Sequence, residues 1–423
     1  MPTPTAIIGT ATDGPTGTGP VSERATSHAV TGASSSTRAP ATEHTPTEAP
    51  TRSVTPERRD LSGPELARFA DPAVWTADTR AALHDAGLDA AQVAAVVGRA
   101  LAEDLAFGDD ATTAATVPAG TIAEASFTPR SAGVLAGGPV ARAVLDTVTA
   151  ALGSSPFTVL DGLPDGATLR PGAPALRIRG PVTAMLTAER TALNLLCQLS
   201  GVATVTHRWV QAVAGTGARV RDTRKTVPGL RTLQKYAVRC GGGTNHRMGL
   251  GDAVLIKDNH VAAAGSVTAA IHAVRAARPD LPMQVEVDEL DQLAEALAAG
   301  AGSILLDNFD TEQTAAAVRL TRAGYPGVLL ESSGGLSLER AAEVAATGVD
   351  FLAVGALTHS APALDIGLDI AADIAADTAV DTGTGAATGT GTVTDANAET
   401  EVDGTAGLGL HTGPAEVGST LSR

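Results

Sequence analysis

Aromatic residues are scarce in this chain of 423 residues, which has six Phe, two Tyr and two Trp, or 2% of the total. An extended nucleic-acid surface needs a wide basic face and usually aromatic side chains on which bases stack. This chain is acidic overall, with a net charge of −16. We therefore expect no nucleic-acid partner.

Cysteine is scarce too, with Cys197 and Cys240 as the whole complement. Two cysteines imply no disulfide scaffold, and they fit a reducing compartment. The first residues lack the basic start and the long apolar run of a secretion signal, and no stretch of about 18 residues is apolar enough to cross a bilayer. We expect a soluble, cytoplasmic protein without a membrane partner.

Regular apolar patterning is missing at both ends of the chain. Residues 1–72 are rich in Thr, Pro, Ser and Ala, and residues 376–423 are mostly Thr, Gly, Ala and Asp. Segments of this composition cannot bury enough apolar surface to offset the entropy that ordering costs. The composition therefore predicts disordered tails over both ranges.

Short helical and strand-like segments follow each other between residues 73 and 190. The segment Asp89–Leu105 carries one apolar stripe at helical spacing, whereas Ile122–Phe127 and Ala175–Ile178 are short apolar runs separated by Gly and Pro. Turn signals come too often for long helices. The pattern predicts a small N-terminal α+β domain over residues 73–190.

From residue 191 onwards, short apolar strands alternate regularly with helices. Six successive β-α units predict a parallel sheet, either doubly wound or closed into a barrel. Polar residues end the strands, as they do at the catalytic mouth of α/β barrels, which favours a barrel over residues 191–362. Residues 363–375 are expected to return to the N-terminal domain. The predicted strands are Ala218–Arg221, Ala253–Ile256, Met283–Val287, Ser303–Leu306, Gly327–Leu330 and Phe351–Val354.

Positive charge is concentrated between Arg219 and Lys257, where nine Lys and Arg accompany two Asp, giving a local charge of about +7. The rest of the chain is strongly acidic. A short basic segment of this kind, interleaved with glycines, favours a small polyanionic substrate bound in a cleft.

Two glycine-containing segments follow successive predicted strands. Ser332–Gly335 precedes a predicted helix, where backbone N–H groups can hold a phosphate without a charged side chain. Gly355–Leu357 follows the last strand, where barrel enzymes often place the other half of a phosphate site. A plain tight turn explains either segment alone. Their succession favours a bound phosphate group.

Several stretches of this sequence resemble the quinolinate phosphoribosyltransferase family. The resemblance covers roughly residues 89–370 and leaves both tails outside. It implies an N-terminal α+β sandwich-like domain followed by a seven-stranded α/β barrel of the type II phosphoribosyltransferase kind. The stretches that carry it are Glu189–Thr204, Asp222–His260, Val285–Ala301, Ile304–Asn308 and Ser333–Gly335.

The resemblance also implies a reaction and its partners. Phosphoribose would pass from phosphoribosyl pyrophosphate to quinolinate with decarboxylation, giving nicotinate mononucleotide, pyrophosphate and CO2 for NAD synthesis. The cofactor would be Mg2+. The assembly would be a homodimer whose active sites are completed across the interface, or a hexamer built from such dimers.

The same resemblance assigns roles to individual side chains. Catalytic roles fall to Lys225, Lys257, Glu286 and Asp307, and the last two would also hold Mg2+. Arg190 would reach into the pocket of the partner subunit. The substrate-binding set is Arg190, Thr223, Arg224, Lys225, His246, Arg247, Lys257, Glu286, Asp307, Ser333, Gly334, Gly335, Gly355 and Ala356.

Chemistry supports these roles independently of the resemblance. Quinolinate carries two adjacent carboxylates, and Arg grips such groups bidentately. Ribosyl transfer develops positive charge on the sugar, which fixed carboxylates such as Glu286 and Asp307 can stabilise. The plainer alternative is a structural ion pair for each of these carboxylates, and a helix salt bridge for Arg190.

One stretch departs from the family pattern. Glu103–Thr113 is EDLAFGDDATT, where the family is usually close to EDLGxGDVTT. Ala106 thus replaces a glycine, and one extra residue precedes the threonines. We expect a change of local geometry or interface packing and no change of reaction.

Three other functions are compatible with the pattern. A paralogue of the same fold could transfer phosphoribose to another acidic aromatic base. A barrel aldolase could use Lys257 as a Schiff-base lysine at a strand end. A catalytically silent binding protein would not need Glu286 and Asp307 together with the glycine segments.

Overall fold

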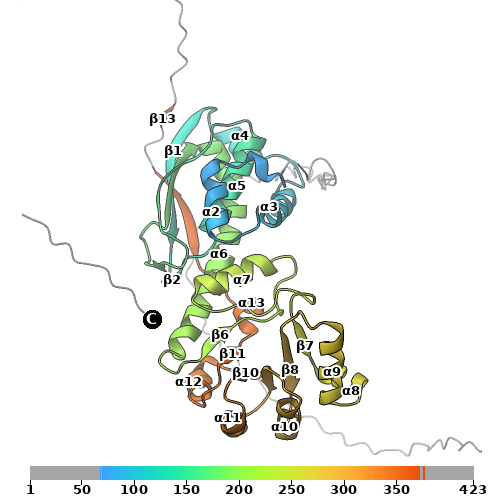
Figure 1. Cartoon of the computed structure of the whole chain (residues 1–423). Helices are drawn as coiled ribbons and strands as arrows, with labels where there is room; N and C mark the ends of the chain where they lie inside the picture. The colour runs from blue at the N-terminus through green and yellow to red at the C-terminus, as the bar shows by residue number, and fades with distance from the viewer. Residues whose placement is uncertain (1–66, 68, 372–374, 377–423) are drawn as a thin grey trace, which may run out of the picture. The chain divides into compact units, whose positions relative to one another are not determined.

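The computed structural model describes residue 67, residues 69–371 and residues 375–376 (Figure 1). The predicted tails over residues 1–72 and 376–423 lie outside the described residues except at their inner ends. Within the described part, no helix is long and apolar enough to cross a membrane. Three sheets and the helices around them make up this part.

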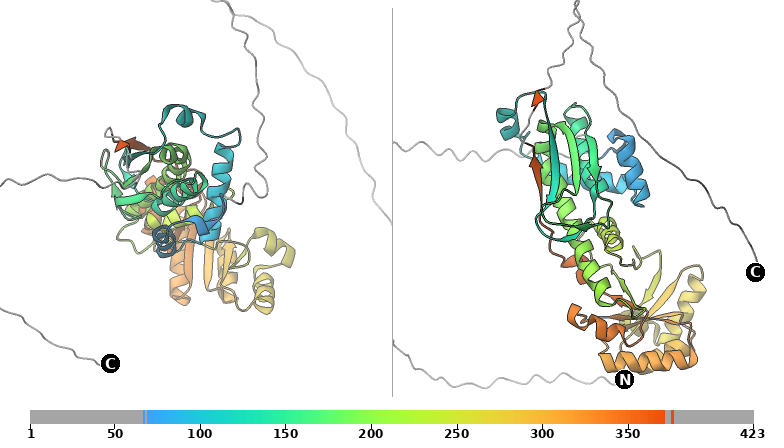
Figure 2. Two further views of the ribbon diagram at one scale, coloured as in Figure 1. Left: turned by 90° about the horizontal axis from the view of Figure 1, so that it is seen from above. Right: turned by 90° about the vertical axis from the view of Figure 1, so that its left-hand side faces the viewer.

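An antiparallel sheet in the order β12-β1-β5-β3 organises the N-terminal region. β1 (Thr121–Pro129) is central, and buried residues alternate with half-buried ones along most of its length. β5 (Leu176–Pro181) and β3 (Thr158–Gly162) extend the sheet on one side. On the other side β12 (Ile366–Ile370) pairs with β1, as the right-hand view of Figure 2 shows in orange, and β13 (Ala375–Ala376) pairs with the start of β1. The chain therefore returns to its first sheet after leaving the second.

Most helices of the N-terminal region begin at a side-chain N-cap, although the helix that follows Gly137 does not. The predicted helix over Asp89–Leu105 is confirmed as α3 (Ala90–Asp104), and the Asp89 carboxylate accepts a hydrogen bond from the backbone N–H of Gln92 at 2.8 Å. Such caps satisfy N–H groups that have no partner inside the helix. The other elements are η1 (Pro72–Val74), α2 (Ala77–Asp85), α4 (Ala111–Thr116), β2 (Gly133–Val134), α5 (Gly138–Ala151) and β4 (Thr168–Leu169).

A helix of 31 residues, α6 (Val182–Ala212), links this region to the second sheet. It packs against α5 and contacts β1, β5 and β12, and it also contacts β6 and α7. The boundary predicted between residues 190 and 191 falls inside this helix and is no break in the backbone. The reason is that neither Gly nor Pro interrupts the apolar pattern until Gly201.

Gly201 marks a close approach between α6 and the segment that leads to β12. A Cβ atom at Gly201 would lie 2.0 Å from the carbonyl oxygen of Pro362. Only glycine allows the two backbones to come this close. The return of the chain to its first sheet thus depends on this position.

The second sheet has six parallel strands in the order β6-β11-β10-β9-β8-β7. The first strand in sequence therefore pairs with the last, as in a barrel, and the cyclic order is broken between β6 and β7. The strands are β6 (Arg219–Arg221), β7 (Val254–Ile256), β8 (Met283–Val287), β9 (Ser303–Asp307), β10 (Leu329–Ser333) and β11 (Phe351–Ala353).

The strand count differs from the expected seven, because the described residues contain six strands in this sheet. The free edge of β6 carries a single parallel bridge between Arg221 and Thr244, with Thr244 N donating to Val220 O at 2.8 Å. This bridge is the only pairing on that side of β6 in the described part of the chain. A run of glycines just before Thr244 shortens the pairing to one residue.

The residue range of one predicted strand needs a correction. The apolar run Gly327–Leu330 marks only the entry to β10, which continues through Ser333. Glu331 and Ser332 are buried within it and pair with Leu305 and Leu306 of β9. The sequence pattern misplaced the strand because these buried residues are polar.

Helices connect and cover the parallel strands. Their apolar residues join the strands in one cluster of buried side chains that also includes residues of the N-terminal region. The helices are α7 (Arg231–Cys240), α8 (Asp258–Ala264), α9 (Val267–Ala277), α10 (Leu290–Ala298), α11 (Thr311–Gly324), η2 (Leu338–Arg340), α12 (Ala341–Ala345) and α13 (Ala356–His359).

Candidate active site

The carboxyl ends of the parallel strands bring most of the predicted site residues to one edge of the sheet. The parallel register places the ends of all six strands there. The residues at or just beyond these ends are Asp222, Thr223, Arg224, Lys225, Lys257, Glu286, Asp307, Ser333, Gly334, Gly335, Gly355 and Ala356.

Lys257 and Glu286 form an ion pair at this edge, with Nζ 2.5 Å from Oε2. The Glu286 side chain is 10% exposed, whereas that of Lys257 is 44% exposed. His260, in the first turn of α8, accepts a hydrogen bond at Nδ1 from the backbone N–H of Lys257 at 3.0 Å. The Lys257 amine is thus engaged by a carboxylate and not free to attack a carbonyl carbon, which argues against the aldolase alternative.

Asp307 ends the neighbouring strand β9 and lies near the same cations. Burial raises the pKa of the Asp307 carboxyl above its ordinary value, although Lys257 and Lys225 act in the opposite direction. Its Oδ2 atom accepts a hydrogen bond from the side-chain amide of Asn308 at 2.8 Å. A partly desolvated carboxylate between two lysines is suited to interact with a group that gains positive charge during a reaction.

Lys225 reaches the strand end of β11. A Cβ atom at Gly355 would lie 3.1 Å from Cδ of Lys225, so glycine at this position leaves room for the lysine side chain. The Lys225 carbonyl accepts a hydrogen bond from the hydroxyl of Thr358, a buried residue of α13, at 2.8 Å. Thr223 Oγ1 accepts a hydrogen bond from the Lys225 backbone N–H at 3.0 Å. The lysine backbone is thus fixed while its amine stays exposed.

Gly334 and Gly335 follow β10 with positive φ angles of 83° and 58°. A Cβ atom at Gly334 would lie 2.2 Å from Oδ1 of Asn308, which itself has a φ of 58°. The backbone N–H of Asn308 donates to the Ser333 carbonyl at 2.8 Å. A cavity of about 160 Å³ lies beside this turn, lined in part by Asp310 and by Arg340, whose guanidinium is a possible anion ligand. Close packing accounts for the glycine at 334, and the left-handed φ accounts for the glycine at 335.

Arg224 and Arg247 are two half-buried cations of the site that have no ion-pair partner in the described part of the chain. The Nε atom of Arg224 is buried and has no hydrogen bond, and the Arg247 guanidinium donates to the carbonyl of Ala253 at 3.0 Å. Burial and the nearby Arg224 both lower the pKa of Arg247. Two half-buried guanidinium groups that repel each other form a site for an anion.

His246 has partners on both ring nitrogens. Its Nδ1 atom accepts a hydrogen bond from the backbone N–H of Arg247 at 2.8 Å, so the proton of the neutral ring lies on Nε2. That Nε2 atom donates to Oε1 of Gln284 at 2.7 Å and lies 3.7 Å from the buried Glu331 carboxylate. Glu331 also pairs with Arg221 at 2.6 Å. The imidazole is therefore anchored in a buried polar cluster of the sheet.

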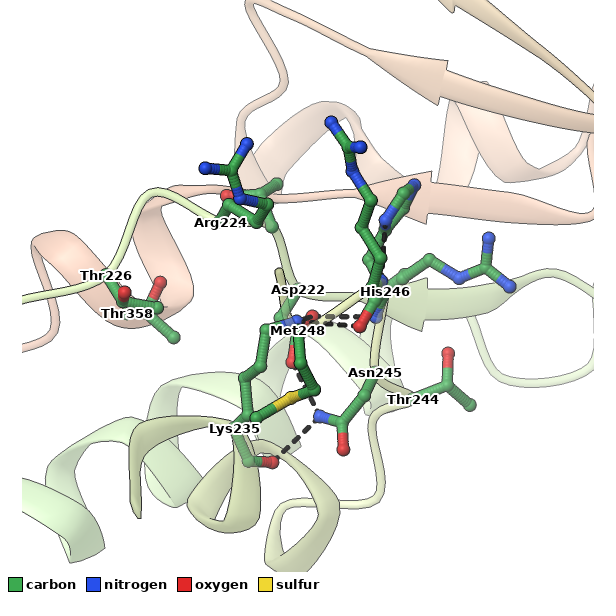
Figure 3. Close-up of polar contacts among 12 residues, drawn as sticks. Asp222, Arg224, Thr226, Lys235, Thr244, Asn245, His246, Met248 and Thr358 are labelled. Atoms are coloured by element: carbon green, nitrogen blue, oxygen red, sulfur yellow. Dashed lines mark hydrogen bonds and ion pairs between the residues drawn. The ribbon is translucent and has the colours of Figure 1, made fainter. Parts of the chain in front are cut away.

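Sequence reasoning missed the buried pair formed by Asp222 and Lys235, which it counted only as charges of the basic segment. Both side chains are 0% exposed, and Lys235 donates to Asp222 and, at 2.9 Å, to the carbonyl of His246. Burial lowers the pKa of Lys235 against the opposing effect of Asp222. The dashed lines in Figure 3 show the contacts of Asp222 with its neighbours. The available signal was an acid directly before Thr223, one of only two acids in a strongly basic segment.

Arg190 is not brought to the other predicted residues. It lies exposed on α6, and in the described part of the chain no hydrogen bond or ion pair joins it to them. Burial raises the pKa of the Cys197 thiol, also on α6, and the charge of Arg190 acts in the opposite direction. Ala356 is exposed too and begins the short helix α13 directly after Gly355.

The departure at Glu103–Thr113 lies at the end of α3 and the start of α4. Asp110 caps α4 by accepting from the Thr113 backbone N–H at 2.9 Å. Thr187 of α6 also donates to Asp110, at 3.3 Å. The altered stretch thus keeps its own cap and remains in the N-terminal region, away from the strand ends.

Comparison with known proteins supports the arrangement of the two regions. The family models for the N-terminal and the C-terminal domain of quinolinate phosphoribosyl transferase match residues 110–200 and 202–369. The chain is 59% identical over 286 residues, 68% of this chain and 99% of the relative, to a protein of Mycobacterium leprae named nicotinate-nucleotide pyrophosphorylase [carboxylating]. A human protein of the same name is 39% identical over 248 residues, 58% of this chain and 81% of the relative.

Solved structures agree with the sequence matches. The nicotinate-nucleotide pyrophosphorylase of Francisella tularensis superposes with a TM-score of 0.61 and 37% identity, covering 66% of this chain and 96% of that one. The two family models together span more than half of the chain. The chain belongs to the quinolinate phosphoribosyltransferase family.

Proposed function

We propose that this protein transfers phosphoribose from phosphoribosyl pyrophosphate to quinolinate with loss of CO2, giving nicotinate mononucleotide and pyrophosphate. The observation that carries the proposal is the pair Arg224 and Arg247, which lack carboxylate partners and lie close enough for one to lower the pKa of the other. A ligand with two adjacent carboxylates would neutralise both. Relatives named carboxylating nicotinate-nucleotide pyrophosphorylases support the same substrate.

The strand-end carboxylates suit the transfer step. The pyridine nitrogen forms a bond to the anomeric carbon of the ribose while the bond to pyrophosphate breaks, and positive charge develops on the sugar. Glu286 and Asp307, held near Lys257, present negative charge at this edge. Lys225 beside Gly355 places positive charge where a phosphate group is expected. These four side chains are the proposed catalytic and phosphoribosyl-binding set together with Ser333, Gly334, Gly335 and Ala356.

Decarboxylation follows from the product of the transfer step. Once the pyridine nitrogen carries the ribose, the ring is cationic and can accept the electron pair released when the adjacent carboxylate leaves as CO2. A proton then takes the place of that carboxylate. Of the two guanidinium groups of Arg224 and Arg247, one would hold the carboxylate that stays and the other the carboxylate that leaves, with Thr223 and His246 beside them. The positions of the two cations therefore decide which carboxylate is lost.

Mg2+ is proposed as the metal of this reaction. Among the described residues no group of three or more His, Cys, Asp or Glu side chains is placed to hold a metal ion. Glu286 and Asp307 offer two carboxylates, and Mg2+ commonly takes one or two carboxylates together with substrate phosphate oxygens and water. The residues present fit such a shared site. When bound, Mg2+ would neutralise charge on the departing pyrophosphate.

The proposed assembly is a homodimer in which Arg190 completes the site of the partner subunit, or a hexamer built from such dimers. The exposed position of Arg190 on α6, apart from the other cations, supports a role outside its own subunit. We also propose a cytoplasmic location, in keeping with two free cysteines among the described residues.

Turnover with purified protein, phosphoribosyl pyrophosphate and Mg2+ tests the proposal against its alternatives. We expect nicotinate mononucleotide from quinolinate and none from nicotinate, because the second carboxylate is needed to occupy both guanidinium groups. Product from nicotinate alone would keep the fold and move the specificity to a paralogue. Binding of both substrates without product would favour the catalytically silent protein.

A further inference from the structure

The buried pair Asp222 and Lys235 is the centre of a hydrogen-bonded cluster below the site. Asp222 Oδ1 accepts from Lys235 Nζ and, at 2.8 Å, from the backbone N–H of His246. Asp222 Oδ2 accepts from the side-chain amide of Asn245 at 2.6 Å. Asn245 also donates to the Lys235 carbonyl at 2.8 Å, and Lys235 donates to the His246 carbonyl at 2.9 Å. Figure 3 shows Asn245 and Lys235 around Asp222.

This cluster joins the two chain segments that carry the unpaired guanidinium groups. Asp222 comes directly after β6 and two residues before Arg224. Its partners His246 and Asn245 come directly before Arg247. The backbone is tied here as well, because Asp222 N donates to Thr244 O at 3.1 Å. The spacing of the two arginines is therefore set through Asp222 and the residues bonded to it.

Stability alone gives no sufficient reason for a fully buried ion pair at this place. Removing two charges from water costs about as much as their attraction returns, and apolar replacements of similar volume are often neutral or stabilising. The pair does, however, use its remaining hydrogen-bonding capacity on the backbone of His246 and on Asn245. Directional bonds of this kind fix geometry in a way that apolar packing does not.

We propose that Asp222, Lys235 and Asn245 are positioning residues that hold Arg224 and Arg247 at the spacing required by two adjacent carboxylates. The inference rests on the proposed function for the identity of the ligand. Asp222 and Lys235 do not need to touch the substrate, because both side chains are 0% exposed. The carboxylates at Glu286 and Asp307 belong to other strands and are outside this cluster.

The test compares variants of the cluster with a matched pair elsewhere in the same sheet. Asn245→Ala removes one member from a half-buried position, and the double variant Asp222→Leu with Lys235→Met removes both buried charges together, so that no lone charge stays buried. The control is Asp350→Asn, which breaks the ion pair with Arg322, 2.8 Å long, at the opposite edge of the sheet. Thermal unfolding of each protein shows which of them are folded.

Steady-state kinetics then separate positioning from folding. We expect the KM for quinolinate to rise about 10-fold in Asn245→Ala and about 100-fold in the double variant, because small misplacements of binding groups have effects of this size. The KM for phosphoribosyl pyrophosphate should change less than about threefold, and Asp350→Asn should change neither constant. An unchanged KM for quinolinate in folded Asn245→Ala would overturn the proposal. Parallel changes in both KM values would also overturn it.

Hydrogen exchange gives a second readout that does not depend on turnover. The backbone N–H of His246 donates to Asp222, so a peptide that covers residues 244–248 should lose protection in both cluster variants and keep it in Asp350→Asn. Retained protection would contradict the inference. Failure of the unaltered protein to turn over quinolinate would instead overturn the proposed function, and the exchange result would still decide whether the cluster fixes this segment.

Discussion

Two charged residues of the site lie in surroundings that disfavour their charged forms, which indicates a role in binding or catalysis. Arg247 is half-buried beside Arg224 and has a lowered pKa, and Asp307 is partly desolvated and has a raised pKa. Neither arrangement helps the free protein to fold. Groups with perturbed pKa values at one strand edge are typical of functional sites. The two residues make separate predictions, one on binding and one on stability.

Replacing Arg247 by Ala should weaken binding of quinolinate without weakening the fold. A charge-assisted hydrogen bond contributes about 1.5–3 kcal/mol, so the KM for quinolinate should rise roughly 10- to 100-fold. The unfolding temperature should not fall, since the substitution removes repulsion from Arg224. Kinetics and thermal unfolding measure both effects, with Arg278→Ala at an exposed ion pair as the control. An unchanged KM would remove Arg247 from the site.

Replacing Asp307 by Asn should raise stability at neutral pH while activity falls by about 100-fold or more. Burial raises the folded-state pKa of Asp307 above its ordinary value of 3.8, so the folded protein loses stability as the pH rises through the range above 3.8. The Asp307→Asn variant does not lose this stability, because its amide does not ionise. The stability difference should therefore disappear at a pH below 3.8, where the carboxyl is protonated in both the folded and the unfolded state.

The control residue for Asp307 is Asp280, whose carboxyl pKa is shifted in the opposite direction. The exposed Asp280 carboxyl has a pKa lowered by its hydrogen bond with Arg278, so Asp280→Asn should not raise the unfolding temperature at neutral pH. Unfolding curves of the three proteins across the acidic range make the comparison. A lower unfolding temperature for Asp307→Asn at neutral pH would show that the carboxylate stabilises the fold, contrary to this account.

Between elements, a close backbone contact joins α6 to the segment that leads to β12. Gly201→Ala should destabilise the protein by about 1–3 kcal/mol, because a Cβ atom would overlap the Pro362 carbonyl oxygen 2.0 Å away and strain the approach to β12. Gly302→Ala is the matched control, since a Cβ atom there has no neighbour within 4 Å. Equal denaturation midpoints for the two variants would contradict this role of Gly201.

The sequence pattern predicted the strands well, but it did not predict which polar residues are buried inside the fold. All six parallel strands were predicted, since alternating apolar runs and Gly-rich turns mark them clearly. The pattern failed at β10, whose Glu331 is buried inside the sheet and pairs with Arg221 and His246. It also failed at Lys235, which lies buried on α7. A buried polar residue gives no apolar signal, and its partners lie far away in the sequence.

The site was predicted unevenly for the same reason. Lys257, Glu286 and Asp307 stand at strand ends, so the order of strands alone brings them to one edge. The anchoring of His246 by Gln284 and Glu331 depends on contacts between separate strands. Arg190 was assigned by resemblance, and the contacts within one subunit give it no partner at the site.

At the scale of the whole molecule, the proposed dimer makes a prediction about shared sites. Arg190→Ala and Lys257→Ala should each be inactive alone, yet a mixed dimer would contain one site with both residues intact. Random mixing makes about half of the dimers mixed, and each of these has one intact site of two, so about a quarter of the wild-type activity should return. Co-expression with two different tags and purification of the mixed dimer provides the measurement. A purified mixed dimer that remains inactive would place Arg190 in the site of its own subunit.

In the proposed reaction, one site both attaches phosphoribose to quinolinate and releases the carboxylate next to the ring nitrogen. The most direct test uses quinolinate labelled in that carboxylate, with phosphoribosyl pyrophosphate and Mg2+, and follows labelled CO2 and nicotinate mononucleotide in the same reaction. We predict equal amounts of the two products, dependent on phosphoribosyl pyrophosphate, and loss of both in Arg247→Ala at low quinolinate. Mononucleotide without labelled CO2, or labelled CO2 without phosphoribosyl pyrophosphate, would contradict the account.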